Sequence, residues 1–198
     1  LNVNRDAINY ETRKWGQEAN LDGVSDKRVH VYKFAKPSGE PIAVYMNYAM
    51  HPVNGYVLGI FTADIPGAVS RYVEKAFNDD IIVAFSQGAQ GDQNPLYLRT
   101  STNAMASRMG TEITGYELNR EKAEGPLRMV GEPGAKEAKP VDTKVLDNLF
   151  RFIESQGQLL GEEVIRIMTV TTKMTGDVYI KGLEKTVVCP GRKRVDGN

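Results

Sequence analysis

The sequence predicts an α/β fold in which a mixed, partly parallel sheet is flanked by helices, with the site at the carboxyl ends of the strands. Two mainly apolar runs, residues 41–49 and 81–85, are typical of buried strands, and each breaks into polar, turn-forming residues. A helical pattern separates the two runs. Because a right-handed crossover makes such strands parallel, their site loops are expected to open on the same edge of the sheet.

The composition excludes several classes of partner. The 198-residue chain carries 25 basic and 25 acidic side chains, so no overall field attracts nucleic acid or an anionic membrane surface. A single cysteine, Cys189, excludes an internal disulfide and a cysteine-based zinc site, and its thiol is expected to be buried and inert. The longest apolar run is shorter than the roughly 20 residues that span a bilayer, so no transmembrane segment is predicted.

The length suffices for a full core as one domain, or as most of one. The chain begins at Leu1 without a methionine, and residues 191–198 have no capping or packing pattern. We therefore expect a piece of a longer protein. The alternative is a processed chain with a frayed tail.

A hairpin is predicted after a polar start. Residues 1–28 are polar and aperiodic, which predicts irregular structure laid against a core. Residues 29–35 then alternate apolar and polar side chains, and a turn with Pro37 and Gly39 leads into the apolar run from residue 41. This pattern predicts two antiparallel strands, with 29–35 at the edge of the sheet.

Two helices are predicted. The first runs from Asp64, a candidate cap, to Phe77, with Pro66 in its first turn and apolar residues at helical spacing. The second covers residues 142–168 and has the strongest helical pattern, with Asp142 as its candidate cap. Within it, Gly157 and Gly161 permit close approach to a neighbouring element.

The remaining segments lie on either side of the second helix. Residues 97–141 contain turn-forming residues and, in the middle of the segment, side chains of both charges. This composition predicts either an insertion that packs over the site or a long mobile loop. Residues 169–172 and 178–188 are rich in β-branched side chains and are predicted to be closing strands, joined by a turn at Gly176 and Asp177.

His51, directly after the first apolar run, is the first candidate site residue. Its imidazole can bind a metal, act as a base, or only hydrogen-bond at the strand end. His30 falls in the predicted edge strand and is expected to be an exposed cross-strand neighbour. With two histidines in the chain, a three-histidine zinc site is excluded, so further metal ligands must be carboxylates or lie in sequence outside it.

The loop at residues 86–95 holds further candidates. Its small residues and backbone N–H donors are typical of a loop that binds an oxyanion. The same residues are equally typical of a tight turn that has no role beyond connecting two elements. Asp92 can orient His51, bind a cation, or serve the turn. A catalytic triad with Ser86 as the nucleophile would need His51 as its base, and we do not favour this hypothesis. The side chain of Arg5 is either solvated or donates hydrogen bonds from its guanidinium group that hold a carbonyl or carboxylate in place.

Six motifs, in the same order, resemble the neutral/alkaline non-lysosomal ceramidase family, in the part that follows its first metal-binding histidine motif. The resemblance covers most of the chain apart from the insertion, and the order of the motifs is more specific than any one of them. The motifs are Asn4-Arg5 with Tyr10 a few residues on, Gly39-Glu40-Pro41-Ile42-Ala43 leading into Asn47-Tyr48-Ala49-Met50-His51-Pro52, residues 64–67 before a helix, residues 85–95, Leu160-Gly161-Glu162-Glu163-Val164, and Cys189-Pro190-Gly191-Arg192.

The resemblance implies that residues 1–198 are a single partial catalytic domain of a zinc-dependent amidase that cleaves the N-acyl bond of a sphingolipid-like substrate. It implies that His51 is a zinc ligand and that Arg5 lies in the active site. The other ligands would come from the rest of the same catalytic domain, outside this chain, so the chain alone would be inactive. A secreted or periplasmic location is suggested by the resemblance only.

Asn94 departs from the family pattern. The family carries a catalytic serine in Gly-Asp-x-Ser-Pro, and this chain has Gly91-Asp92-Gln93-Asn94-Pro95. An amide is a poor nucleophile, so a metal-activated water is the better attacker, with Asn94 polarising a carbonyl or holding that water. One alternative is a catalytically inactive relative that binds a lipid or glycan; another is a self-contained α/β domain in which His51 is structural.

Overall fold

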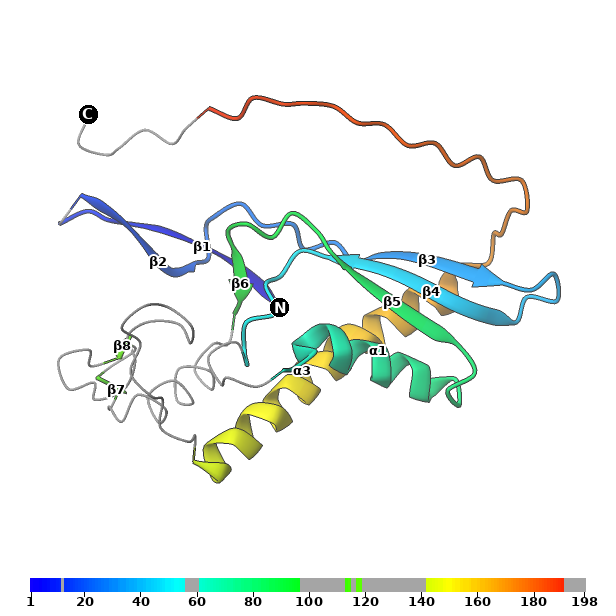
Figure 1. The fold of residues 1–198 in the computed structure, drawn as a ribbon, viewed down its shortest axis with the longest axis horizontal. Helices are drawn as coiled ribbons and strands as arrows, with labels where there is room; N and C mark the ends of the chain where they lie inside the picture. The colour runs from blue at the N-terminus through cyan, green and yellow to red at the C-terminus, as the bar shows by residue number, and fades with distance from the viewer. Residues whose placement is uncertain (12, 56–60, 97–112, 115–116, 119–141, 191–198) are drawn as a thin grey trace.

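The computed structural model describes residues 1–198 except 12, 56–60, 97–112, 115–116, 119–141 and 191–198 (Figure 1). The predicted insertion at 97–141 and the tail at 191–198 therefore lie almost wholly outside the described residues. Within the insertion, two short strands pair antiparallel: β7 (Ile113–Thr114) and β8 (Glu117–Leu118).

The main sheet has the strand order β3-β4-β5. Its strands are β3 (His30–Ala35), β4 (Pro41–Tyr48) and β5 (Ile82–Gln87). β3 pairs antiparallel with β4, and β4 pairs parallel with β5. The structure thus confirms an α/β fold with a mixed, partly parallel sheet, and it confirms that β3 is an edge strand.

Helix α1 (Asp64–Ala76) forms the crossover between the two parallel strands, as predicted. The predicted capping role of Asp64 is wrong, since Ala63 is the N-cap residue and makes no side-chain cap. Asp64 is instead buried, and its carboxylate accepts hydrogen bonds from Asn54 Nδ2 at 3.0 Å and from the Gly55 amide at 2.8 Å. It therefore ties the loop that follows His51 to the start of the helix.

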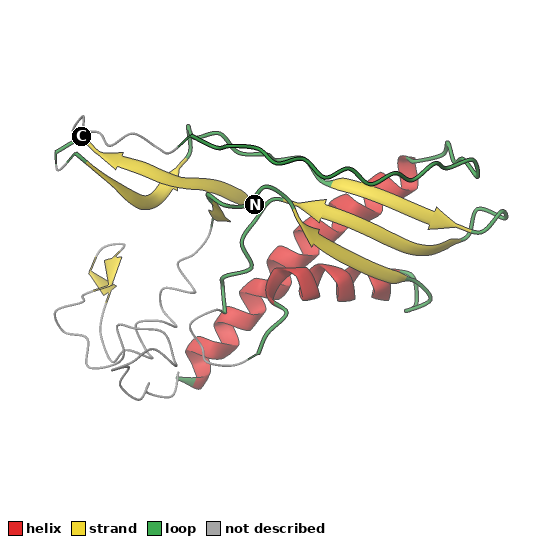
Figure 2. Ribbon diagram, turned by 45° about the horizontal axis from the view of Figure 1, so that its top comes forward, coloured by secondary structure: helices red, strands yellow, loops and turns green. Residues whose placement is uncertain are grey.

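Helix α3 (Thr143–Val170) packs across α1, and both helices lie on the same face of the main sheet (Figure 2). Asp142 caps it as predicted, because its side chain accepts hydrogen bonds from the amides of Lys144 and Val145. A Cβ atom added at Gly157 would lie 2.9 Å from the carbonyl carbon of Ala68. The predicted close approach at this glycine is confirmed.

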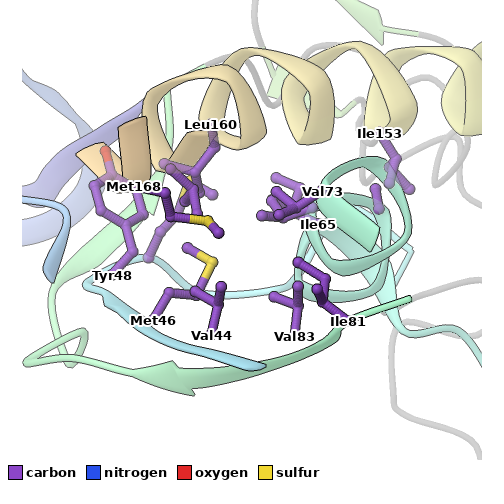
Figure 3. Packing of buried hydrophobic residues seen from close by; sticks show 14 of the residues in the cluster. Val44, Met46, Tyr48, Ile65, Val73, Ile81, Val83, Ile153, Leu160 and Met168 are labelled. Carbon is purple, nitrogen blue, oxygen red and sulfur yellow. The ribbon is translucent and has the colours of Figure 1, made fainter. Parts of the chain in front are cut away.

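The core lies between the sheet and the two helices (Figure 3). Its sheet side comes from alternate residues of β4 and from β5, as the period of two in a strand requires. The buried apolar residues are Val44, Met46, Tyr48, Met50, Ile65, Ala68, Val69, Val73, Ile81, Val83, Leu149, Ile153, Leu160, Val164 and Met168. Among the helices that the structure describes, none is both long and apolar enough to cross a membrane.

The prediction of irregular structure over residues 1–28 holds for residues 21–28, which form no strand or helix, and is wrong for most of the residues before them. β1 (Asn2–Asn9) and β2 (Lys14–Asn20) pair antiparallel, and β6 (Gln93–Pro95) pairs with the other edge of β1. The buried side chains of β1 include two asparagines, Asn2 and Asn4, as well as Val3. Hydrogen-bonded amides replace apolar side chains on the buried face, so the alternating apolar pattern of a strand is missing.

Two predictions for the end of the chain are also wrong. Residues 169 and 170 belong to α3, and residues 171–190 form no strand. β-branched composition favours a strand only where a partner strand is available, and the large apolar side chains of this segment are exposed. Cys189, expected to be buried, is exposed as well.

Replacing Gly157 by alanine should destabilise the fold by about 1–3 kcal/mol, because the added methyl group collides with Ala68 on α1. Chemical denaturation would measure the change in the free energy of unfolding. The matched control is Ser155→Ala, an exposed position on the same helix, where the effect should stay within about 0.5 kcal/mol. Equal stability of the two variants would contradict the close packing of α1 on α3.

Candidate active site

The two predicted site loops meet at the carboxyl ends of β4 and β5. The Gly88 amide donates to the Tyr48 carbonyl at 3.0 Å, and the His51 amide donates to the Gln93 carbonyl at 2.9 Å. These bonds connect the loop after one parallel strand to the loop after its neighbour. The prediction that both loops open on one edge of the sheet is confirmed.

A third segment reaches the same place through β1. Asn4 of β1 lies opposite Gln93 of β6, and the Arg5 amide donates to the Asp92 carbonyl at 2.8 Å. This pairing brings Arg5, from the start of the chain, to residues 91–94. The structure thus gathers all four predicted site residues, which are Arg5, His51, Asp92 and Asn94.

The carbonyl oxygen of Gly91 is the common contact of two of these side chains. Arg5 Nη2 donates to it at 3.0 Å, and His51 Nε2 lies 3.4 Å from it. Arg5 Nη1 also donates to Asn94 Oδ1 at 3.2 Å. Because both acceptors of the Arg5 side chain are neutral, neither bond neutralises the guanidinium charge beside His51 and Asn94.

Asp92 is held by two amide donors. Its Oδ2 accepts from Asn4 Nδ2 at 2.8 Å, and its Oδ1 accepts from Gln93 Nε2 at 2.7 Å. Over the described part of the chain, no hydrogen bond joins this carboxylate to His51. The proposed orientation of His51 by Asp92 is therefore not seen, and Asp92 instead fixes the loop to β1.

Ser86 and His30 play the minor parts that the sequence predicts. Ser86 Oγ accepts from Asn47 Nδ2 at 2.8 Å and donates to the Met46 carbonyl at 3.2 Å, so it links β5 to β4. His30 is exposed on the edge strand and lies opposite Asn47, which confirms its assignment as a cross-strand neighbour.

Three buried amides beside the site were not among the predicted site residues. Asn2, Asn4 and Gln93 have exposed fractions of 2%, 6% and 2%. Asn2 Nδ2 donates to the Ala49 carbonyl at 2.7 Å, and Asn2 Oδ1 accepts from Tyr48 Oη at 2.9 Å. The one available signal was the spacing of the two asparagines, which flank Val3 and fall on one face of a strand.

His51 fits a metal ligand in one respect. In metal sites, a ligating histidine donates its second ring N–H to a carbonyl or carboxylate. If His51 Nε2 carries the proton and faces the Gly91 carbonyl, Nδ1 is the nitrogen that can bind a metal. Among the residues that the structure describes, no three His, Cys, Asp or Glu side chains form a metal-binding group.

A separate hollow of about 610 Å³ lies on the β1–β2 hairpin. Its lining contains none of the predicted site residues, so its size is no argument about the site at His51. The lining residues are Asp6, Ala7, Ile8, Tyr10, Ala19, Asn20, Leu21 and Asp22.

Comparison with known proteins found no family model that matches the chain and no curated protein that matches its sequence. The likeness to the ceramidase family thus rests on the six motifs alone and stays a prediction.

Replacing Tyr48 by phenylalanine should lower stability by about 1–3 kcal/mol, because the buried Oδ1 of Asn2 loses its donor. Burial raises the pKa of Tyr48, so the folded state favours the neutral phenol. This contribution is present below the unfolded pKa of about 10 and is lost as the pH rises through the folded pKa.

Denaturation curves between about pH 8 and 11 would test this expectation, since the variant should lack part of the alkaline loss of stability. Tyr45→Phe, at a partly exposed tyrosine on the same strand, is the control and should behave like the wild type. Identical pH profiles for the Tyr48 variant and the wild type would contradict the proposed role of the phenol.

Proposed function

We propose that this chain is part of a zinc-dependent hydrolase similar to neutral ceramidase, which cleaves an N-acyl amide bond of a sphingolipid-like substrate by attack of a metal-activated water. The main support is the convergence of Arg5, His51 and Asn94 on the loop that carries Gly91. Arg5 and Asn94 are 89 positions apart in sequence, so their contact comes from the fold and not from local turn chemistry.

In this proposal His51 contributes one nitrogen to the zinc ion, and the rest of the catalytic domain contributes the other ligands. A bound zinc ion would polarise the scissile carbonyl and lower the pKa of a bound water. The Gly91 carbonyl would hold the imidazole ring in the required orientation.

Asn94 and Arg5 would act on the substrate carbonyl. Asn94 Oδ1 accepts from Arg5, so the amide nitrogen is the end of the side chain that can donate to another group. A donor aimed at the carbonyl oxygen stabilises the negative charge that develops during attack. The Arg5 guanidinium fixes the direction of this amide and adds positive charge nearby.

Replacing His51 by alanine in the full-length polypeptide should remove zinc and, with it, hydrolysis of a fluorescent N-acyl sphingosine. Zinc would be measured by elemental analysis of dialysed protein. His30→Ala is the matched control because His30 is the other histidine of the chain and lies exposed on the edge strand. Unchanged zinc content and unchanged hydrolysis in the His51 variant would refute the proposal.

Replacing Asn94 by aspartate should lower kcat by about 10²–10³-fold with the zinc content unchanged, because the donor to the carbonyl oxygen is lost. Asn148→Asp, which makes the same chemical change on the exposed face of α3, should leave the rate unaltered. A kcat within about twofold of the wild type would remove Asn94 from the reaction.

Asn94 also motivates a second candidate function, a relative that binds a lipid or glycan without cleaving it. The amide stands where the ceramidase family has its nucleophilic serine. Under this alternative the wild type shows no hydrolysis of the fluorescent substrate, and Asn94→Ser gains it. Under the metal-activated water mechanism the wild type is already active.

A further inference from the structure

Gln93 lies between two predicted site residues and is 2% exposed. It belongs to β6, beside β1 (Figure 1), and its carbonyl accepts the His51 amide at 2.9 Å. The same residue therefore contacts the histidine loop through its backbone and adjoins Asp92 and Asn94 in sequence.

The Gln93 side chain uses both of its functional groups. Nε2 donates to the Val24 carbonyl at 3.1 Å and to Asp92 Oδ1 at 2.7 Å, while Oε1 accepts from Ser25 Oγ. Only a carboxamide of this length supplies two donors and an acceptor at these places. A glutamate of the same shape would set a carboxylate against Asp92 and against the Val24 carbonyl.

These contacts join the segments that carry the site. The side chain attaches β6 to residues 24–25 and to Asp92, and the backbone carbonyl attaches it to His51. Asn94, the next residue, receives the hydrogen bond from Arg5. Displacement of Gln93 would thus shift His51 relative to Asn94.

We propose that Gln93 is a positioning residue, whose buried carboxamide sets the placement of His51 relative to Arg5 and Asn94. Its importance for catalysis rests on the proposed function. Its effect on His51 does not, and can be measured without a substrate or a metal.

The test is Gln93→Glu in the 198-residue chain, with the His51 backbone amide and imidazole followed by NMR. Exchange of the His51 amide hydrogen should become about 5- to 100-fold faster, the range expected for one disrupted buried hydrogen bond. The His51 imidazole resonances should move, and those of His30 should stay in place. In the full-length polypeptide, zinc affinity should fall by about 10- to 100-fold.

Three further variants separate positioning from general loss of stability. Gln158→Glu makes the same chemical change at an exposed position of α3, and should leave His51 unchanged. Val69→Ala weakens the core at a fully buried site on α1 and should also leave His51 unchanged at matched stability. Ser25→Ala removes one donor to Gln93 Oε1, leaves Asn2 Nδ2 at 3.5 Å as the other, and should move His51 in the same direction as Gln93→Glu, by less.

Unaltered His51 exchange and resonances in Gln93→Glu would overturn the proposal, as would an equal effect of Val69→Ala. If Gln93→Glu does not fold, Ser25→Ala is the deciding variant. Unchanged His51 amide exchange and imidazole resonances in Ser25→Ala would then contradict the proposal. If the wild type binds no zinc while His51 still responds to Gln93, the proposed function fails and the positioning role stands.

Discussion

The parallel pairing of β4 with β5 is the constraint on which the site depends. Their register sets Asn47 opposite Ser86 and Tyr48 opposite Gln87, so both chains leave the sheet at the same level. The crossover through α1 allows no other edge for the two loops. The contact of His51 with the Gly91 carbonyl follows from this arrangement, because a loop leaving the opposite end of either strand would lie a full strand length away.

The crossover is held in place by helix packing on one side and by buried amides on the other. α3 approaches α1 closely at Gly157, which fixes α1 on the sheet. At the carboxyl edge, Asn2 of β1 donates to the Ala49 carbonyl and Gln93 of β6 accepts from the His51 amide, so the sheet of β2, β1 and β6 is joined to the residues that follow β4. Since unsatisfied buried amides are costly, these hydrogen bonds allow little displacement of β1 and β6 relative to β4. The placement of Arg5 beside Asn94 is a consequence of this arrangement.

Elements with a regular apolar pattern could be predicted from the sequence, and elements held by polar contacts could not. The β3–β4 hairpin, α1, β5 and α3 follow the periods of strand and helix, and Asp142 caps as expected. β1 was missed because Asn2 and Asn4 face inward and are satisfied by hydrogen bonds. For residues 178–188 the error is the opposite one: their composition favours a strand, but they pair with no strand among the residues that the structure describes. His51, Arg5, Asp92 and Asn94 were found because they follow strands or match the six motifs, whereas Gln93 depends on tertiary contacts that no local pattern records.

In the proposed function, His51 binds a zinc ion beside Arg5 and Asn94. The most direct measurement is anomalous scattering at the zinc edge from crystals of the full-length polypeptide grown with zinc. We expect a zinc peak about 2.0–2.1 Å from a ring nitrogen of His51, namely Nδ1, because Nε2 faces the Gly91 carbonyl. A zinc ion bound elsewhere, with His51 free of metal, would contradict it.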